Sequence, residues 1–203
     1  MILAIDTSTA ACTAALFDAG GDLVASRDER IGRGHAERLV PMIAELLDAR
    51  AADRVLVGVG PGSFTGIRVG IAAAQGLAIG WDCEVAGVSS LALLAAGAGG
   101  AAEIAAAVDG GHGELFVQQF DGRTLEPTSE LFNLPPAEAA RQISAAVAIG
   151  PGARALVEAR GHGEALDGWP SAANALRLPQ SLRSLPARPI YARAPDARAR
   201  NAA

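Results

Sequence analysis

The order of its secondary-structure signals is the feature that most limits how this chain of 203 residues can fold. Three strand-like segments, residues 2–5, 13–17 and 23–27, come before any helical pattern, and Gly20-Gly21-Asp22 supplies a turn between the last two. A doubly wound sheet would alternate strand and helix from its first strand. The chain therefore begins with antiparallel strands.

Helix and strand signals alternate after this opening. A helical pattern covers 35–48, with an apolar stripe at Leu39, Met42, Ile43 and Leu46 and with Pro41 where the helix either starts or bends. The segments that follow are a strand at 55–59, a helix at 66–79, a strand at 84–88 and a helix at 89–96. This order is that of the ribonuclease-H-like unit shared by actin-like proteins, so we expect an α/β fold of that kind.

The second half of the chain repeats the opening order after a hinge at 97–101. The expected elements are strands at 104–108 and 114–120, a strand or extended piece at 124–131, a helix from Pro135-Pro136 to about 146, and a strand at 148–149, with turns at Gly110-Gly111 and Asp121-Gly122. Beyond 161 the sequence is rich in Pro, Ala and Arg, and the copy should lack a full helix-strand-helix ending. We expect two ribonuclease-H-like lobes, 1–98 and 99–203, the second reduced.

Composition excludes several functions. All seventeen basic residues are arginine, so Schiff-base chemistry and a P-loop lysine are excluded. The net charge of −5 disfavours direct RNA binding. Cys12 and Cys83 suit reduced core thiols, and no run of about 18 apolar residues appears. We expect a cytoplasmic protein that does not associate with a membrane.

Two loops could bind an anion or a nucleotide. At the first hairpin, Asp6, Thr7 and Ser8 resemble the phosphate-binding hairpin of actin-like kinases, although Ser8 stands where glycine is usual. The second loop precedes the helix at 66–79, and its candidate residues are Gly60, Gly62, Ser63, Thr65 and Arg68. The simpler alternatives are a hydrogen-bonded turn at the hairpin, which we favour, and a tight turn that lets the helix pack closely.

The helix at 66–79 carries only two polar residues, Arg68 and Gln75. Glycines inside a helix cost about 1 kcal/mol each, which suggests that something packs closely against them. The helix is either buried within its own domain or covered by a partner, and we favour the partner, so Gly70→Leu should abolish pairing and spare the fold. The expected interface residues are His35, Leu39, Met42, Ile43, Leu46, Gly66, Ile67, Gly70, Ile71, Ala74, Leu77 and Ala78.

The sequence gives little support for a hydrolase, whether metal-dependent or serine-dependent. The three histidines, His35, His112 and His162, show no metal-binding spacing, and we expect no metal site. Ser63 is not central in a G-x-S-x-G elbow, so serine hydrolysis is disfavoured.

The chain resembles the TsaB family, also called YeaZ. The resemblance rests on ILAIDTS at 2–8, on the long motif GPGSFTGIRVGIAAAQGLA at 60–78, and on GVSSL at 87–91. It is thinner in the second half, where AVD at 107–109, GELF at 113–116 and PIYAR at 189–193 match. Gly110-Gly111 departs from the family's pattern.

This resemblance implies an accessory subunit, without catalytic residues or a cofactor of its own, for making threonylcarbamoyladenosine on tRNA. It implies pairing with the catalytic subunit TsaD through the helices of the first half, and binding of the ATPase TsaE. Contact with tRNA would be indirect, ATP or ADP could lie at the complex interface, and the free chain could self-associate through the same helices. The alternatives are an actin-like ATPase or small-molecule kinase that uses Asp6 and Asp109, and a peptidase.

Overall fold

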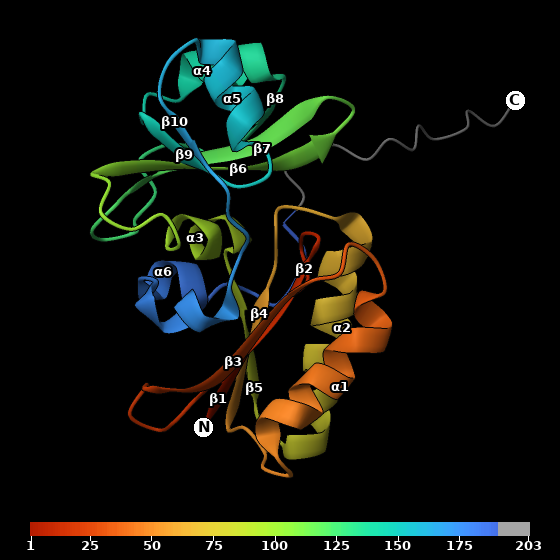
Figure 1. The fold of residues 1–203 in the computed structure, drawn as a ribbon. Coiled ribbons are helices and arrows are strands. Elements are labelled where there is room, and N and C mark those ends of the chain that lie inside the picture. The colour runs from red at the N-terminus through yellow and green to blue at the C-terminus, as the bar shows by residue number, and fades with distance from the viewer. Residues whose placement is uncertain (191–203) are drawn as a thin grey trace, which may run out of the picture.

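The computed structural model describes residues 1–190 and contains two five-stranded sheets, one above the other (Figure 1). In the first sheet the strand order is β3-β2-β1-β4-β5. β1 pairs antiparallel with β2 and parallel with β4. The elements of this half are β1 (Ile2–Asp6), β2 (Ala11–Phe17), β3 (Leu23–Arg30), α1 (His35–Leu47), β4 (Arg54–Gly58), α2 (Phe64–Trp81), β5 (Glu84–Val88) and α3 (Ser90–Ala95).

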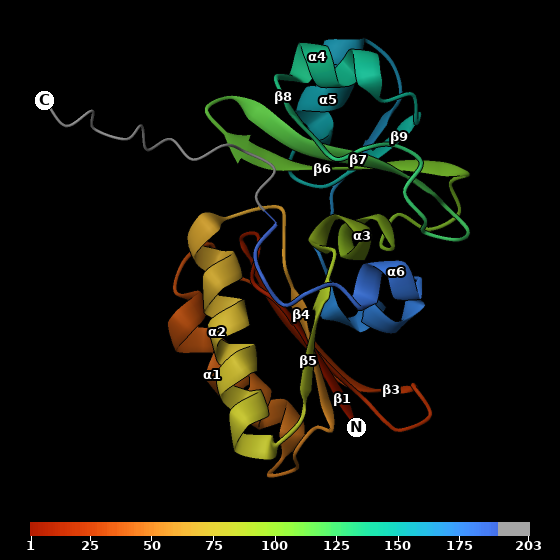
Figure 2. The ribbon, with the colours of Figure 1, turned by 180° about the vertical axis from the view of Figure 1, so that it is seen from behind.

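Both faces of the first sheet are covered, which explains why every residue of β2 is buried. Successive side chains of a strand point to opposite faces. Leu3 and Ile5 of β1 join the core with α1 and α2, whereas Ala4 joins the core that contains α3. Figure 2 shows α1 and α2 side by side on one face of the sheet and α3 on the other, beneath the second sheet.

The second sheet repeats this topology, with the order β10-β9-β6-β7-β8. Its elements are β6 (Glu103–Gly111), β7 (Glu114–Asp121), β8 (Phe132–Leu134), α4 (Pro136–Gln142), β9 (Val147–Ile149), α5 (Ala153–Arg160) and β10 (Glu164–Leu166). The two-lobed actin-like fold is confirmed. The expected lack of a full helix-strand-helix ending is wrong for its helix and strand, because α5 and β10 are present, whereas a 3-10 helix follows β10 in place of an α-helix. The reduction lies in length, since α5 has 8 residues where α2 has 18.

Three local predictions in the second half need correction. The expected turn at Gly110-Gly111 lies at His112-Gly113, where both residues have positive φ angles (54° and 79°) and β6 runs on to Gly111. The extended piece at 124–131 forms no strand and makes one isolated bridge, between Phe120 and Pro127. Helix α4 ends at Gln142, not near residue 146.

The chain returns to the first sheet after β10, through the 3-10 helix η1 (Ala172–Arg177) and α6 (Gln180–Arg183). The Ala172 N–H donates to Thr13 Oγ1 at 2.9 Å, and Leu185 exchanges two backbone hydrogen bonds with Gly87. The division at residue 98 stays a prediction, and residues 171–190 pack on the first sheet. The end of the expected closing strand, residues 191–193, lies outside the described residues.

Among residues 1–190 no helix is long and apolar enough to cross a membrane.

Candidate functional site

The carboxyl group of Asp6 is enclosed where β1 turns toward β2. Its Oδ1 accepts hydrogen bonds from the backbone N–H of Ser8 at 2.8 Å and from the Ser8 hydroxyl at 2.7 Å. Its Oδ2 accepts the Ser90 hydroxyl from the start of α3 at 2.5 Å. The Asp6 side chain is 0% exposed, so both of its oxygens are satisfied inside the protein.

Gly58 at the end of β4 makes room for this carboxyl group. A Cβ added there would lie 1.8 Å from Asp6 Oδ2, closer than any side chain can approach. Burial raises the pKa of Asp6, and the hydrogen bonds from Ser90 and Ser8 oppose that rise. A carboxylate held in this way cannot reach a metal or a phosphate unless the hairpin rearranges, and the hydrogen-bonded turn accounts for Asp6 and Ser8 as they lie.

The loop at residues 60–63 fixes the start of α2 against the same hairpin. Ser63 is the N-cap, and its hydroxyl accepts the Gly66 N–H at 3.2 Å. The Thr7 hydroxyl donates to the Gly66 carbonyl at 2.7 Å. Thr65 is exposed, and Arg68 donates to the Phe64 carbonyl at 3.2 Å along its own helix. An anion site at this loop stays a prediction.

Four small residues of α2, Gly66, Gly70, Ala74 and Ala78, are buried against the chain's own first lobe. A Cβ on Gly66 would meet the Thr7 carbonyl oxygen at 2.0 Å, and one on Gly70 would meet Thr7 Oγ1 at 2.6 Å. The hairpin is thus what packs against these glycines, and Gly70→Leu would disturb the core instead of sparing the fold. We expected a partner to pack against these glycines, but the chain's own hairpin does so.

Most of the expected interface residues are buried within the same chain, so a partner cannot touch them unless the helices move. Leu77 is partly exposed. The buried ones are His35, Leu39, Met42, Ile43, Leu46, Gly66, Ile67, Gly70, Ile71, Ala74 and Ala78. A partner surface on α1 and α2 stays a prediction, but other residues would have to form it.

The outer face of α2 has little charge. Phe64 is 65% exposed and Ile79 is 84% exposed, and Ala72 and Gln75 lie on the same side of the helix. Val40 of the neighbouring α1 is 54% exposed. Large apolar side chains at such exposure on adjacent helices are unusual on a surface that meets only water.

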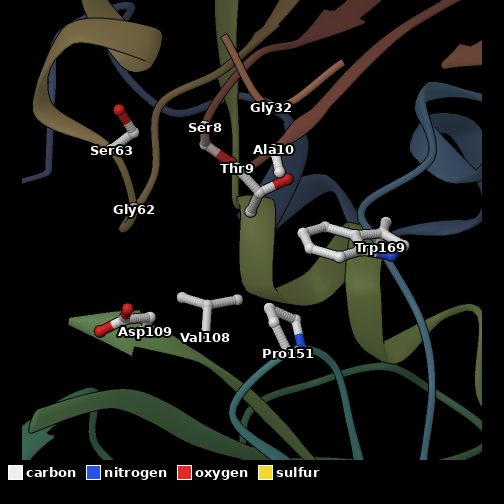
Figure 3. Close-up of a pocket in the computed structure, with 10 residues that line it drawn as sticks. All are labelled: Ser8, Thr9, Ala10, Gly32, Gly62, Ser63, Val108, Asp109, Pro151 and Trp169. Carbon is white, nitrogen blue, oxygen red and sulfur yellow. The ribbon is translucent and has the colours of Figure 1, made fainter. Parts of the chain in front are cut away.

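A cleft of about 340 Å³ lies between the lobes (Figure 3). The first lobe contributes both candidate loops, and the second contributes the end of β6 and the loop before α5. The residues that line the cleft are Ser8, Thr9, Ala10, Gly32, Gly62, Ser63, Val108, Asp109, Pro151 and Trp169.

The structure brings part of the predicted nucleotide or anion set together. Ser8, Gly62 and Ser63 line the cleft, whereas Asp6 and Thr7 are buried beneath it. Sequence reasoning missed Gly58 and Ser90 as partners of Asp6. A glycine inside a strand is a signal of close backbone approach, and it was available at Gly58. Ser90 carried no such signal.

Known proteins and a family model match this chain in sequence. A family model described as "TsaD: tRNA N6-adenosine threonylcarbamoyltransferase" matches residues 25–153. The "tRNA threonylcarbamoyladenosine biosynthesis protein TsaB" of Escherichia coli K12 is 40% identical over 127 residues, 59% of this chain and 54% of that protein. The protein of the same name from Haemophilus influenzae is 40% identical over 126 residues, 58% of this chain and 52% of that protein. The chain thus spans about half the length of these relatives.

Solved structures match over a longer span. "YeaZ from Pseudomonas aeruginosa" superposes with a TM-score of 0.79 and 34% identity, covering 94% of this chain and 98% of that one. A second structure, described as "an uncharacterized protein with similarity to peptidase YEAZ from Pseudomonas aeruginosa", gives 0.81 and 35%, covering 95% and 99%. Fold and site together define a two-lobed α/β protein of the actin-like class. Within that class, the chain belongs to the TsaB family, also called YeaZ.

Proposed function

We propose that this protein takes part in the biosynthesis of threonylcarbamoyladenosine on tRNA as a non-catalytic subunit that binds a TsaD-type catalytic subunit. The names of the curated relatives support the pathway. The match to a TsaD family model supports a partner of homologous fold. Homologous subunits often pair through equivalent surfaces, in the manner of a two-fold dimer.

The observation that carries the proposal is the weakly charged outer face of α2, next to the exposed Val40 of α1. Phe64, Ile79 and Val40 are all more than half exposed, and the exposed side of α2 has a single charged residue, Arg68. Burying such side chains stabilises a complex by about 25 cal/mol for each Å² removed from water. A catalytic partner would cover this face.

The state of Asp6 supports a non-catalytic role. An actin-like ATPase or kinase needs a carboxylate that can approach the metal or the attacking group. Here both Asp6 oxygens accept internal hydrogen bonds, and Gly58 lies against Oδ2. We expect a TsaE-type ATPase to supply ATP turnover, and any ATP or ADP in the complex to lie at an interface, not in this chain alone. Contact with tRNA would pass through the catalytic subunit.

The proposal is tested by co-expression with a TsaD-type subunit, using wild-type chain and the Ile79→Asp and Phe64→Asp variants. We expect each variant to fold and to lose co-elution, because an aspartate would have to be desolvated within the contact. Val24→Asp is the matched control, since Val24 is 47% exposed on β3 and lies off this face. It should co-elute normally.

Two results would contradict the proposal. Undiminished co-elution of both α2 variants would show that the outer face of α2 is not the binding surface for the TsaD-type subunit. ATP turnover by the purified chain alone would favour the kinase or ATPase alternative. Size-exclusion chromatography of the free chain tests self-association, which the same two variants should abolish if it uses the same helices.

A further inference from the structure

The cleft between the lobes has a polar end and an apolar end. Figure 3 shows Asp109 at one end and Trp169 at the other, with Val108 and Pro151 between them. Its volume of about 340 Å³ is at the small end of the range for ligand pockets, which is roughly 300–1,000 Å³. The cleft therefore has room for a small molecule and too little for a folded segment.

Asp109 gives the cleft its charge. It is the one charged side chain among the described lining residues, and it is exposed. Its Oδ1 accepts the Gly111 N–H at 2.7 Å. Among residues 1–190, Asp109 Oδ2 has no hydrogen-bond partner, so this oxygen can accept a hydrogen bond from a ligand.

The hydroxyl groups of Thr9 and Ser63 add polarity on the first-lobe side. Thr9 Oγ1 accepts the Ala11 N–H at 3.2 Å, and Ser63 Oγ accepts the Gly66 N–H at 3.2 Å. A hydroxyl that accepts one bond still has its own hydrogen to donate. These groups can serve a neutral polar atom of a ligand without neutralising Asp109.

The apolar end is held in place by its neighbours. The Arg30 guanidinium lies 4.6 Å from the centroid of the Trp169 ring, within the range of a cation–π contact. This contact ties the loop after β10 to the end of β3. Trp169, Pro151 and Val108 together form an apolar wall that is suited to a hydrocarbon or a ring.

This distribution disfavours a polyphosphate. Lysine is absent from the chain, and the described lining residues include no arginine. A triphosphate placed here would face the Asp109 carboxylate, while the Arg30 guanidinium is stacked on Trp169 at the opposite end of the cleft. A protonated amine would instead be attracted to that carboxylate.

We propose that the cleft between the lobes binds a small amphipathic amine, whose protonated nitrogen pairs with Asp109 and whose apolar part packs against Trp169, Pro151 and Val108. The site is separate from the outer face of α1 and α2, so it does not depend on the function proposed above.

The test compares two probes of similar size and opposite charge, phenethylamine and 3-phenylpropionate, on the full chain. Binding is followed by calorimetry and by NMR shifts of the amides of residues 108–111. We expect phenethylamine to bind at least tenfold more tightly than 3-phenylpropionate, as a charge-assisted hydrogen bond implies.

Asp109→Asn should weaken phenethylamine binding about tenfold and leave the fold intact, because the asparagine oxygen can still accept the Gly111 N–H. Trp169→Ala should weaken both probes. Glu158→Gln, an exposed carboxylate on α5 outside the cleft, is the matched control and should bind like wild type.

Three outcomes would overturn the proposal: equal or tighter binding of 3-phenylpropionate, an Asp109→Asn variant that binds phenethylamine like wild type, or no binding of phenethylamine up to its solubility limit.

Discussion

The first hairpin of each lobe contains an aspartate with the same local hydrogen bond but opposite exposure. In each hairpin the aspartate Oδ1 accepts the N–H two residues on, at 2.8 Å for Asp6 and 2.7 Å for Asp109. Strand β1 ends at Asp6, whereas β6 runs two residues beyond Asp109 to Gly111. Asp6 is fully buried and bonded to Ser90, whereas Asp109 is exposed at the cleft. The same local hydrogen bond thus belongs to a buried structural aspartate in the first lobe and to a solvent-accessible aspartate in the second.

What surrounds each turn explains the difference. The first hairpin lies under the start of α2, where Thr7 bonds to Gly66, and beside α3, which supplies Ser90. The second hairpin ends in a glycine-rich tip and lies at the edge of the cleft. The comparison teaches that a carboxylate in this turn has no fixed role, because its packing decides whether a ligand can reach it.

The strongest way to break this comparison is to replace each aspartate by alanine. Asp6→Ala leaves the Ser8 N–H and two hydroxyls without their acceptor inside the core, and we expect a loss of about 3 kcal/mol or more in the free energy of unfolding. Asp109→Ala should change it by about 0.5 kcal/mol, as for an exposed site. Urea denaturation monitored by circular dichroism measures both, and equal losses would show that the two turns are equivalent.

A smaller effect should follow from Ser90→Ala. The Ser90 hydroxyl donates to Asp6 Oδ2 and accepts the Gly60 N–H at 3.1 Å, so its removal leaves two buried groups unpaired. We expect a loss of about 1–3 kcal/mol. Ser181→Ala, at an exposed hydroxyl bonded to Glu126, is the control and should lose less. A Ser90→Ala variant as stable as wild type would mean that Asp6 does not need this bond.

The smallest effect concerns pH. Because burial raises the pKa of Asp6 in the folded state, the unfolded chain releases this proton at lower pH than the folded chain does. The contribution of Asp6 to stability is therefore greatest below about pH 4 and falls as the pH rises toward the raised pKa. Asp6→Asn removes this dependence, so its stability relative to wild type should rise with pH across that window. Urea midpoints at several pH values measure it, and a constant difference would contradict the raised pKa.

The sequence predicted the first lobe closely because its signals are local. The strand at 84–88 is confirmed to the residue, and helix α1 begins at His35 as expected. Pro41 lies inside α1 without ending it, because α1 packs on the sheet through Leu39, Met42 and Ile43.

The second lobe was predicted less well because distant contacts set its boundaries. Helix α4 stops early since the N–H groups of Ser144 and Ala145 donate to Gln119 Oε1, at 3.0 and 2.9 Å. The piece after Gly122 stays a loop because Asp121 caps the N–H groups of its next residues and Pro127 has none to give. Helix α5 was missed because only Ala153 and Leu156 of its residues are buried, too few for a visible period.

The candidate site was predicted in part. The sequence indicated the hairpin at Asp6 and the loop at residues 60–63, but it could not show that Trp169 joins them at the cleft from the loop after β10. The sequence also showed that α2 contains glycines, but it did not show whether they face the chain's own sheet or a partner. A glycine inside a helix indicates that another group packs closely against the backbone, and only the structure shows whether that group belongs to the same chain.

The return of residues 171–190 to the first sheet has a consequence for synthesis on the ribosome. The nascent first lobe emerges without η1 and without the segment that pairs with Gly87, so its α3 side remains uncovered while the second lobe is translated. Apolar surface exposed for that time invites misassembly, which chaperones counter in cells. Final closure of the lobe made first must therefore wait for residues near the end of the described chain.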